Sequence, residues 1–437
     1  MDYVMHEKFP QISTDELYNQ LGNPDVCILD IRPVDAYNGW RLHGEVRGGH
    51  IKEARNISAK WMDYIEWIEI MDAKGITHDK KLIIYGYNES QTENVARQVC
   101  KAGYPDVTVY HRFVDEWCKN DELPMEYLPN YRNLVPAAWL RDFIAGKTVG
   151  ETPGDRYVIC HTHYQNRADY EKGHIPGAID LDTNWLESTE TWNRRSPEEL
   201  KKVFEDLGIT HDTTVILYGN FSNPTYEDPF PGSSAGQLAA FRCAFIMLYA
   251  GVKDVRVLNG GMQSWMDEGY EETTEEGKRN PVSDFGADIP ARPELVVDVP
   301  EAKEILNAPD KNLVCMRSWP EYIGEFSGYH YIEKKGRIPG AVFANCGSDA
   351  YHMENYRNLD HTNREYHEIE KTWASLGITA DKHNAFYCGT GWRGSEAFFN
   401  AYLLGWPRIS VFDGGWFEWS ADEKNPYETG IPEQIAT

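Results

Sequence analysis

The chain has 437 residues, with 43 basic and 69 acidic side chains and a formal net charge of −26. A chain this acidic repels phosphate backbones and anionic lipid headgroups, so nucleic acids and membranes are not expected as partners. Its length fits about three domains of roughly 100 to 200 residues, and its 41% apolar and 13% aromatic residues exclude a disordered chain.

No run of the sequence approaches the ~18 uncharged apolar residues that a membrane span needs. The first ten residues lack the cationic start and apolar run of a signal peptide, so we expect a cytoplasmic protein, or a periplasmic one if such a peptide has been removed. The eight cysteines form no CxxC pair, which favours neither a disulfide framework nor a zinc site.

The first copy of a repeated unit covers residues 1–130. An apolar run at 26–31 and a second run ending at Tyr85 predict two strands, with a helix between Tyr85 and Gly103. Gly103 lies fourteen residues before Trp117. The residue after the second strand is Gly86.

The second copy, residues 131–285, repeats these spacings through Tyr218, Gly251 and Trp265. Gly219 again follows the tyrosine, but 33 residues separate Tyr218 from the helix-ending glycine, against 18 in the other copies. The additional residues, around 220–233, form a loop long enough to be functional. A lid or docking element near the third domain and a decorative insertion both remain open.

The third copy, residues 286–437, contains the same marks at Tyr387, Gly405 and Trp419. Strand, helix and strand in this order predict right-handed crossovers and a parallel sheet flanked by helices. The fold class is therefore α/β, with three tandem domains.

Only the third copy places a cysteine after its tyrosine. Cys388 opens the sequence Cys-Gly-Thr-Gly-Trp-Arg (388–393), directly before an amphipathic helix. At such a turn the positive end of the helix and several backbone N–H groups point toward the sulfur, which is the environment of reactive thiolates. The alternative is an inert core cysteine, which the adjacent glycines make less favourable.

The chain resembles the rhodanese-type sulfurtransferases, and among them the bacterial proteins with three rhodanese domains. The resemblance covers nearly the whole chain and rests on the 388–393 loop, Gly-His-Ile-Pro-Gly-Ala (173–178), Arg-Ile-Pro-Gly-Ala (337–341) and Asp-Gly-Gly-Trp-Phe-Glu-Trp (413–419). It implies that Cys388 takes a sulfane sulfur from thiosulfate or 3-mercaptopyruvate as a persulfide and passes it to a thiol, a protein acceptor or cyanide. The first two copies, with glycine at this position, are then inactive.

By the same resemblance the substrate-binding residues are those of the loop, namely Gly389, Thr390, Gly391, Trp392 and Arg393. Both donors are anions, and Arg393 is the only cation of the loop, so we expect it to bind the donor, with Arg317 or Arg337 close by. The alternative is that Arg393 braces the loop from behind.

The third copy departs from the family in one place. Rhodaneses commonly open the domain with Asp-x-Arg, which the first copy keeps at 30–32, whereas the third copy reads Cys315-Met316-Arg317. Cys315 is then expected at the end of the strand beside the one that leads to Cys388. It is a candidate resolving thiol, although an inert strand cysteine is favoured.

Two other classes compete with a transferase. A cysteine phosphatase would place its arginine six residues after the cysteine, whereas here it is at the fifth. A non-enzymatic persulfide carrier or scaffold fits the two inactive copies. No metal is expected, because the pairs His161/His163 and His352/His361 have no second pair at ligand spacing, and no cofactor is expected, because no nucleotide-binding loop follows a strand.

Overall fold

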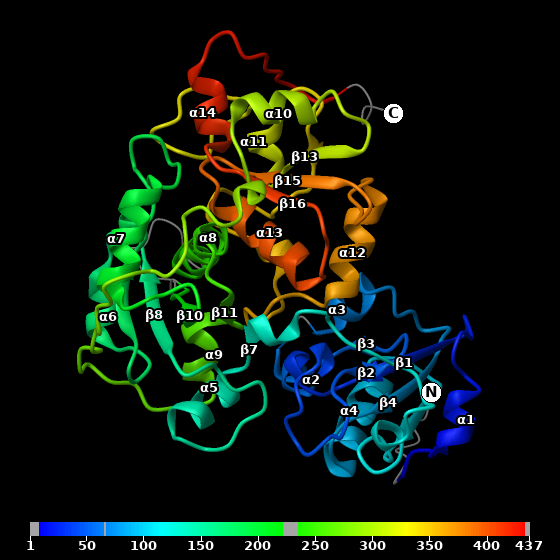
Figure 1. The fold of residues 1–437 in the computed structure, drawn as a ribbon. Helices are drawn as coiled ribbons and strands as arrows, with labels where there is room; N and C mark the ends of the chain where they lie inside the picture. Colours follow the sequence, from blue (N-terminus) through cyan, green and yellow to red (C-terminus); the bar gives the residue numbers. More distant parts are fainter. Residues whose placement is uncertain (1–7, 65–66, 222–234, 433–437) are drawn as a thin grey trace. The chain divides into compact units, whose positions relative to one another are not determined.

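The computed structural model describes residues 8–64, 67–221 and 235–432. The chain divides into two compact units, residues 1–132 and 133–437. The first unit contains one parallel sheet and the second contains two, as the ribbon in Figure 1 shows. The expected α/β class with parallel sheets flanked by helices is confirmed.

The first unit has a four-stranded parallel sheet of order β3-β1-β4-β5 and a small antiparallel pair, β2-β6. Its strands are β1 (Val26–Asp30), β2 (His50–Ile51), β3 (Arg55–Asn56), β4 (Lys81–Tyr85), β5 (Val107–Tyr110) and β6 (Met125–Glu126). Its helices are α1 (Thr14–Tyr18), α2 (Val34–Asn38), α3 (Trp67–Ala73) and α4 (Glu89–Lys101).

The second unit begins with a five-stranded parallel sheet of order β7-β11-β10-β8-β9. Its strands are β7 (Leu134–Val135), β8 (Tyr157–His163), β9 (Ile179–Asp182), β10 (Thr214–Tyr218) and β11 (Asp254–Leu258). Its helices are α5 (Ala137–Ile144), α6 (Arg167–Lys172), α7 (Pro197–Leu207), α8 (Ala235–Ala250) and α9 (Gly261–Asp267).

The other sheet of the second unit has the same topology, with order β12-β16-β15-β13-β14. Its strands are β12 (Val296–Val297), β13 (Lys311–Cys315), β14 (Val342–Phe343), β15 (His383–Tyr387) and β16 (Ile409–Phe412). Its helices are α10 (Val299–Ile305), α11 (Trp319–Ile323), α12 (Tyr366–Ser375), α13 (Trp392–Leu403) and α14 (Gly415–Ala421). Short 3₁₀ helices lie at Ala59–Asp63, Trp117–Lys119, Tyr131–Asn133, Thr183–Trp185, Pro293–Leu295 and Glu354–Tyr356.

The repeated tryptophans have one structural role in all three copies. Each is buried and donates its indole N–H to a backbone carbonyl six or seven residues later, Trp117 to Pro124, Trp265 to Glu271 and Trp419 to Pro426. The bond ties the segment after the final helical turn to the body of the domain.

In the first two copies, the repeated tyrosine at the end of the central strand accepts a hydrogen bond from the backbone of a loop. The Tyr85 hydroxyl accepts a hydrogen bond from the Ile51 amide at 3.1 Å, and the Tyr218 hydroxyl accepts one from Ile175 at 3.0 Å. In these two copies the repeated tyrosine therefore closes one loop over its sheet.

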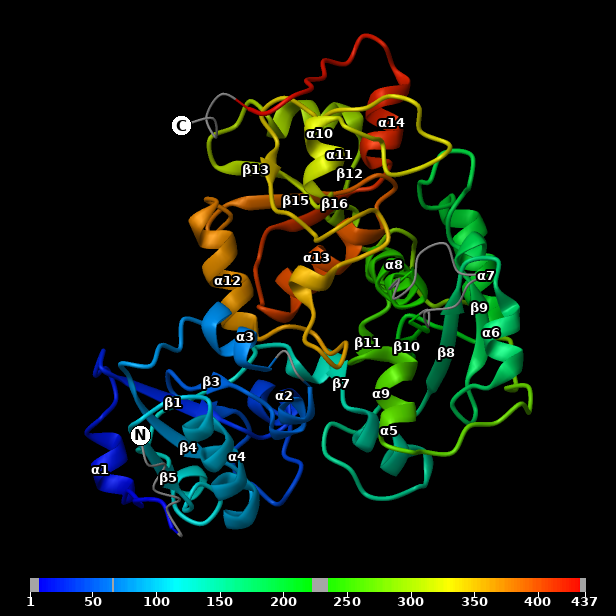
Figure 2. The same ribbon diagram turned by 180° about the vertical axis from the view of Figure 1, so that it is seen from behind.

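Helices α8 and α13 join the two sheets of the second unit, and they lie side by side in both views (Figures 1 and 2). Their contact is aromatic, since Phe241 meets Phe399 and Phe245 meets Phe398 edge-on, with ring centroids 5.4 Å apart in each pair. All four rings are buried. The second and third copies thus share one apolar core between equivalent helices.

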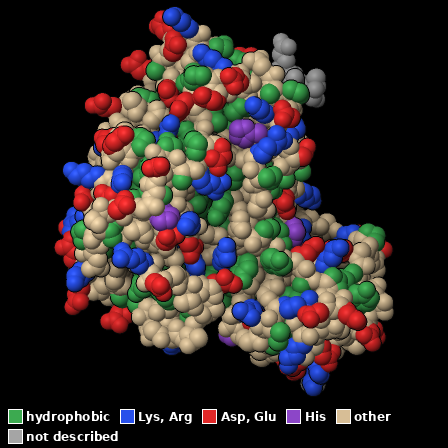
Figure 3. All heavy atoms as spheres, in the orientation of Figure 1, with side chains coloured by type: hydrophobic (Ala, Val, Ile, Leu, Met, Phe, Trp, Pro, Cys, Tyr) green, Lys and Arg blue, Asp and Glu red, His purple; other side chains and the backbone are tan. Residues whose placement is uncertain are grey.

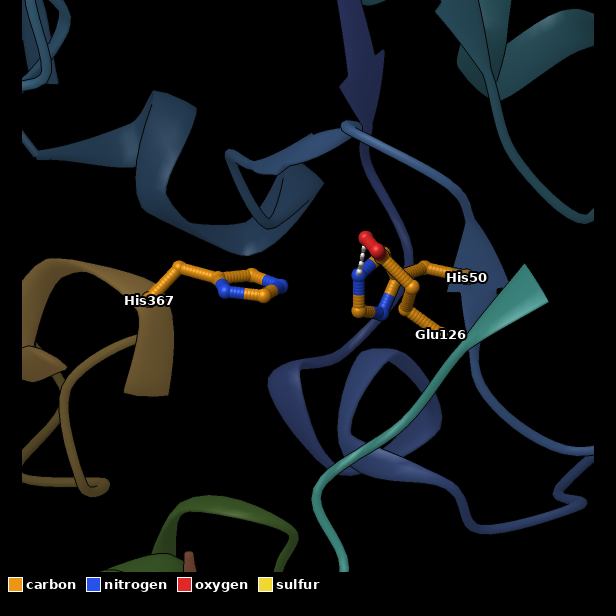
Figure 4. A group of neighbouring side chains, drawn as sticks. All are labelled: His50, Glu126 and His367. Atoms are coloured by element: carbon orange, nitrogen blue, oxygen red, sulfur yellow. Dashed lines mark ion pairs between the residues drawn. The ribbon is translucent and has the colours of Figure 1, made fainter. Parts of the chain in front are cut away.

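The histidine of the first copy's Gly-His-Ile sequence is structural. His50 stacks on Tyr37 at 3.6 Å, and its Nε2 lies 3.8 Å from Glu126 Oε2, the ion pair drawn in Figure 4. His174 repeats the stacking on Tyr170 at 3.7 Å. His367, also drawn in Figure 4, belongs to α12 of the second unit.

The face of the molecule in Figure 3 carries acidic and basic side chains interspersed. Among the described helices, none combines the length and apolar character that crossing a membrane requires. Most of the 220–233 insertion lies outside the described residues. At its start, Phe221 stacks on His361 of the third copy at 4.3 Å.

Candidate active site

Cys388 lies between β15 and α13, at the carboxyl end of the central strand of its sheet. Its side chain is fully buried. The first N–H groups of α13 have no acceptor within the helix, because helical bonding begins only after the first turn. The structure therefore gives Cys388 the strand-to-helix environment that the sequence predicts.

The first turn of α14 holds this loop through its backbone. The amide of Trp416 donates to the Cys388 carbonyl at 2.9 Å, and the amide of Phe417 donates to the Gly389 carbonyl at 2.9 Å. Gly415 has a φ of +52°, and a Cβ at this residue would lie 2.6 Å from the Cys388 carbonyl oxygen. Only glycine permits this approach, which fixes the Cys388 carbonyl.

Arg393 occupies the bracing position that the sequence analysis left open. Its guanidinium makes two hydrogen bonds of 2.9 Å to the carboxylate of Glu321. It also donates to the Cys346 sulfur, the Asp349 carbonyl and the Tyr329 hydroxyl. Of the three guanidinium nitrogens of Arg393, only Nε has no hydrogen-bond partner among the described residues. The charge expected to meet an anionic donor is therefore neutralised by a carboxylate of the same domain.

Glu321 comes from the first turn of α11, where it also closes a capping box with Ser318. Burial disfavours its ionised form, but the ion pair with Arg393 outweighs burial and lowers the pKa of Glu321 below its usual value. A capping glutamate has a sufficient local explanation in the sequence, so nothing local indicated its second role.

Tyr329 covers the loop. A Cβ on Gly389 would lie 2.1 Å from the Tyr329 ring, so the ring rests directly on the backbone beside Cys388. A guanidinium only donates hydrogen bonds, so in its 2.9 Å contact with Arg393 the Tyr329 oxygen accepts. The hydroxyl hydrogen is left to donate elsewhere. Burial raises the pKa of Tyr329 well above its usual value, which keeps it a neutral donor.

Further aromatic side chains continue from Tyr329 around the loop. Tyr329 and Tyr331 have ring centroids 5.4 Å apart, and Trp192 stacks on Tyr331 at 5.3 Å. Tyr164 lies 5.7 Å from Trp192 and 5.9 Å from Trp392. We call these five side chains the aromatic rim. Two of them belong to the second copy and three to the third, and the carboxylate of Glu187 accepts a hydrogen bond from Trp392 Nε1 at 3.0 Å.

The remaining candidates lie outside this group. Cys315 ends β13 and pairs in register with Tyr387, as expected, and its thiol is buried. Arg317 is buried over the Trp416 ring and donates to the Gly336 carbonyl. Arg337 is bonded to Glu428 near the C-terminal segment.

The equivalent turns of the first two copies have no room for a nucleophile. A Cβ on Gly86 would lie 2.7 Å from Ile31, and one on Gly219 would lie 1.8 Å from the Gly236 carbonyl oxygen. In the first copy, Arg32 pairs with Asp30 at 2.6 Å, the bridge that the third copy loses at Cys315.

Comparison with known proteins matches the family of rhodanese-like domains to residues 13–120, 160–268 and 298–422. The thiosulfate sulfurtransferase YnjE of Escherichia coli K12 is 40% identical over 428 residues, covering 96% of this chain and 92% of YnjE. The sulfur carrier protein TtuD of Thermus thermophilus is 34% identical over 65% of this chain and 93% of its own length.

Among solved structures, wild-type EanB is 58% identical and superimposes with a TM-score of 0.94, covering 97% of this chain and 99% of EanB. Similar values hold for an anaerobic ergothioneine biosynthesis enzyme from Chlorobium limicola, solved in complex with its natural substrate trimethyl histidine; it is 58% identical over 97% of this chain and all of that one, with a TM-score of 0.94. Other EanB structures contain hercynine, or ergothioneine with a persulfide on cysteine.

The EanB positions substituted in those structures all have counterparts here. Relative to its persulfide cysteine, EanB has a tyrosine 59 residues earlier, a threonine 2 residues later, and further cysteines 73 and 42 residues earlier. Counted from Cys388, these spacings reach Tyr329, Thr390, Cys315 and Cys346, with the residue type identical in every case.

Proposed function

Because this chain belongs to the rhodanese-like family and is a sulfurtransferase with three such domains, we propose that Cys388 carries the sulfur and that its acceptor is the imidazole ring of trimethylhistidine. The product is then ergothioneine, the 2-thio derivative of that ring. This acceptor differs from those expected from the sequence, which were a thiol, a protein acceptor or cyanide.

The observation that carries the proposal is that Tyr329, Thr390 and Cys388 match, in residue type and spacing, three residues named in the EanB structures. EanB is 58% identical to this chain over 97% of this chain's length. Two side chains that touch or adjoin the sulfur-bearing loop are thus retained in type and spacing.

The aromatic rim supports the same acceptor. Quaternary ammonium groups bind over the faces of tryptophan and tyrosine rings, because the negative face of the ring attracts a cation that cannot donate hydrogen bonds. The rim supplies five such rings in a series that starts at Tyr329 over Gly389 and ends at Trp392 of the Cys388 loop, and the carboxylate of Glu187 adds negative charge next to Trp392. Arg393, by contrast, offers little net charge to a dianionic donor, because Glu321 balances it.

The proposed transfer balances without a further reactant. The terminal sulfur of the Cys388 persulfide forms a bond to the ring carbon between the two nitrogens, and the S–S bond breaks with its electron pair going to Cys388 Sγ. The hydrogen on that carbon leaves as a proton. Carbon is oxidised by two electrons, and the sulfane sulfur is reduced by two. In this proposal the Tyr329 hydroxyl, which accepts from Arg393, donates its hydrogen to a ring nitrogen during this step.

The test is incubation of the full chain with a sulfane-sulfur donor (thiosulfate, 3-mercaptopyruvate or inorganic polysulfide, each in turn) and trimethylhistidine, with ergothioneine measured by mass spectrometry. Tyr329→Phe keeps the ring over Gly389 but removes the hydroxyl, so it should load sulfur normally and form product about a hundredfold more slowly. Equal product formation by Tyr329→Phe would remove the hydroxyl from the mechanism.

A second candidate function is transfer from thiosulfate to cyanide or a thiol, favoured by the 40% identity to YnjE over 96% of the chain. Discharge of loaded Cys388 by cyanide or a thiol, with no ergothioneine from trimethylhistidine, would establish that function instead. Loading with no discharge by any of them would point to a sulfur carrier.

A further inference from the structure

Helices α8 and α13 each contribute one member of a buried ion pair. The helix provides the cation in one pair and the anion in the other. In the second copy the helix supplies the cation, and Arg242 of α8 binds Glu187 at 2.8 Å. In the third copy the helix supplies the anion, and Glu396 of α13 binds Arg357 at 2.7 Å. Arg242 and Glu396 occupy the same position of the repeat, each nine residues before the glycine that ends its helix.

The first pair reaches into the Cys388 loop. Arg242 Nη1 lies 2.6 Å from Asp413, which lies just before α14, the helix whose first turn holds the Cys388 carbonyl. A Cβ on Gly391 would lie 2.9 Å from the same nitrogen, so the guanidinium packs against the loop backbone. Glu187 accepts from Trp392 Nε1 at 3.0 and 3.2 Å. Two residues of the second copy thus contact the loop from behind and at its rim.

Arg242 also holds a second member of the rim. Its Nη2 donates to the Trp192 carbonyl at 3.0 Å, and Trp192 stacks on Tyr331. Arg194, from the same segment as Trp192, reinforces the contact by donating to Asp413 through its amide at 2.8 Å and its guanidinium at 3.0 Å.

The second ion pair, Arg357 with Glu396, lies against the second copy, whose loop has Gly219 in place of a nucleophile. Arg357 lies over the rings of Phe221 and Phe241, both of the second copy, and its guanidinium also donates to the His361 carbonyl and to Asn363 Oδ1. Among the described residues, no hydrogen bond or ion pair joins the side chains of Arg357 and Glu396 to residues 388–392. The repeat therefore contains a matched pair of ion pairs, one at a cysteine loop and one at a glycine loop.

We propose that Glu187 and Arg242, from a domain without a nucleophile, are positioning residues for the third domain: they orient Trp392 and the Asp413 turn so that the Cys388 loop presents its sulfur for transfer. The inference rests on Cys388 being the sulfur-bearing residue. It does not depend on which acceptor the protein uses.

The experiment compares Glu187→Gln with Glu396→Gln in the full chain. Each removes the charge of one buried glutamate that has an arginine partner, and each should lower the melting temperature. Cys388 is loaded with polysulfide, and discharge to saturating cyanide is timed by mass spectrometry. Glu187→Gln should slow discharge about tenfold, the effect of one hydrogen bond to a charged group. Glu396→Gln should stay within about twofold of the wild type.

Trp392→Phe provides an independent check, because it removes the indole N–H that Glu187 accepts and retains an aromatic ring. It should slow discharge to a similar degree, and the double variant with Glu187→Gln should be no slower than the slower single variant, since both remove one interaction. If Glu187→Gln does not fold, unchanged discharge in Trp392→Phe overturns the proposal by itself.

Equal slowing by Glu187→Gln and Glu396→Gln would reduce the role of Glu187 to stability and overturn the proposal. If the double variant discharges more slowly by the product of the two single slowing factors, the proposal is also overturned. Failure of the wild type to gain sulfur on Cys388 would instead overturn the proposed function, and the positioning role with it.

Discussion

Arg393 carries the only positive charge of the 388–393 loop, and one residue far away in the sequence determines whether that charge is balanced. The sequence favours a donor-binding role because both expected donors are anions and the loop has no other cation. Glu321, 72 positions earlier, balances the charge through two hydrogen bonds. An ion pair between distant positions leaves no pattern in one sequence, whereas the Cys388 loop is a local motif and could be predicted. Tyr329 escaped prediction for the same reason.

The variant Arg393→Gln therefore tests whether Arg393 braces the 388–393 loop. It leaves Glu321 buried without its cation, and the loop that Arg393 anchors should lose its orientation. We expect kcat/KM to fall about ten- to a hundredfold, the effect of lost hydrogen bonds to a charged group, and to fall equally for thiosulfate and 3-mercaptopyruvate. Steady-state kinetics with both donors measure this. A loss confined to thiosulfate would show that the guanidinium binds the donor after all.

At the scale of elements, the loop between β15 and α13 is confined between the Tyr329 ring and the first turn of α14. Gly389→Ala tests this confinement, because its Cβ would meet the ring at 2.1 Å. We expect a lower melting temperature and at least a tenfold loss of sulfur transfer as the ring or the loop shifts. Gly154→Ala is the matched control, since a Cβ there meets nothing within 4 Å. Full activity of Gly389→Ala would mean that Tyr329 moves aside at no cost.

The two ion pairs beside the α8–α13 contact predict a dependence of stability on pH. Burial, only partly offset by the arginine partners, raises the pKa of Glu187 and of Glu396 from 4.5 to about 7. The folded state then holds protons that the unfolded chain releases, so the two groups lose stabilising effect as pH rises from about 4.5 through about 7.

Calorimetry measures this as a difference between proteins. Between about pH 5.5 and about pH 7.5, the wild type should lose more melting temperature than the double variant Glu187→Gln/Glu396→Gln, whose amides do not titrate at these pH values. Parallel curves for the two proteins would contradict the raised pKa values.

Across the whole molecule, the repeat could be predicted and the pairing of its copies could not. Tyr85, Tyr218 and the repeated tryptophans serve each domain internally, so their spacing recurs in the sequence. Arg242 and Asp413 belong to different copies and are 171 positions apart, and their pairing appears only when two sheets share α8 and α13.

A prediction about truncation follows from that shared core. Residues 133–437 form one compact unit, whereas residues 286–437 alone would expose Phe398 and Phe399 and leave Asp413 without Arg242. We expect the 133–437 fragment to fold and to load Cys388 within about threefold of the full chain, and the 286–437 fragment to aggregate. Circular dichroism and sulfur loading test both. Normal loading by the shorter fragment would show that the second copy is dispensable.

The most direct measurement of the whole account is peptide mass spectrometry of the full chain, first after a sulfane-sulfur donor and then after trimethylhistidine. The account predicts one added sulfur on the peptide that contains Cys388, its disappearance as ergothioneine forms in equal amount, and neither event in Cys388→Ser, because a hydroxyl does not form the persulfide. Ergothioneine formation by Cys388→Ser, or sulfur carried to product by a different cysteine, would contradict it.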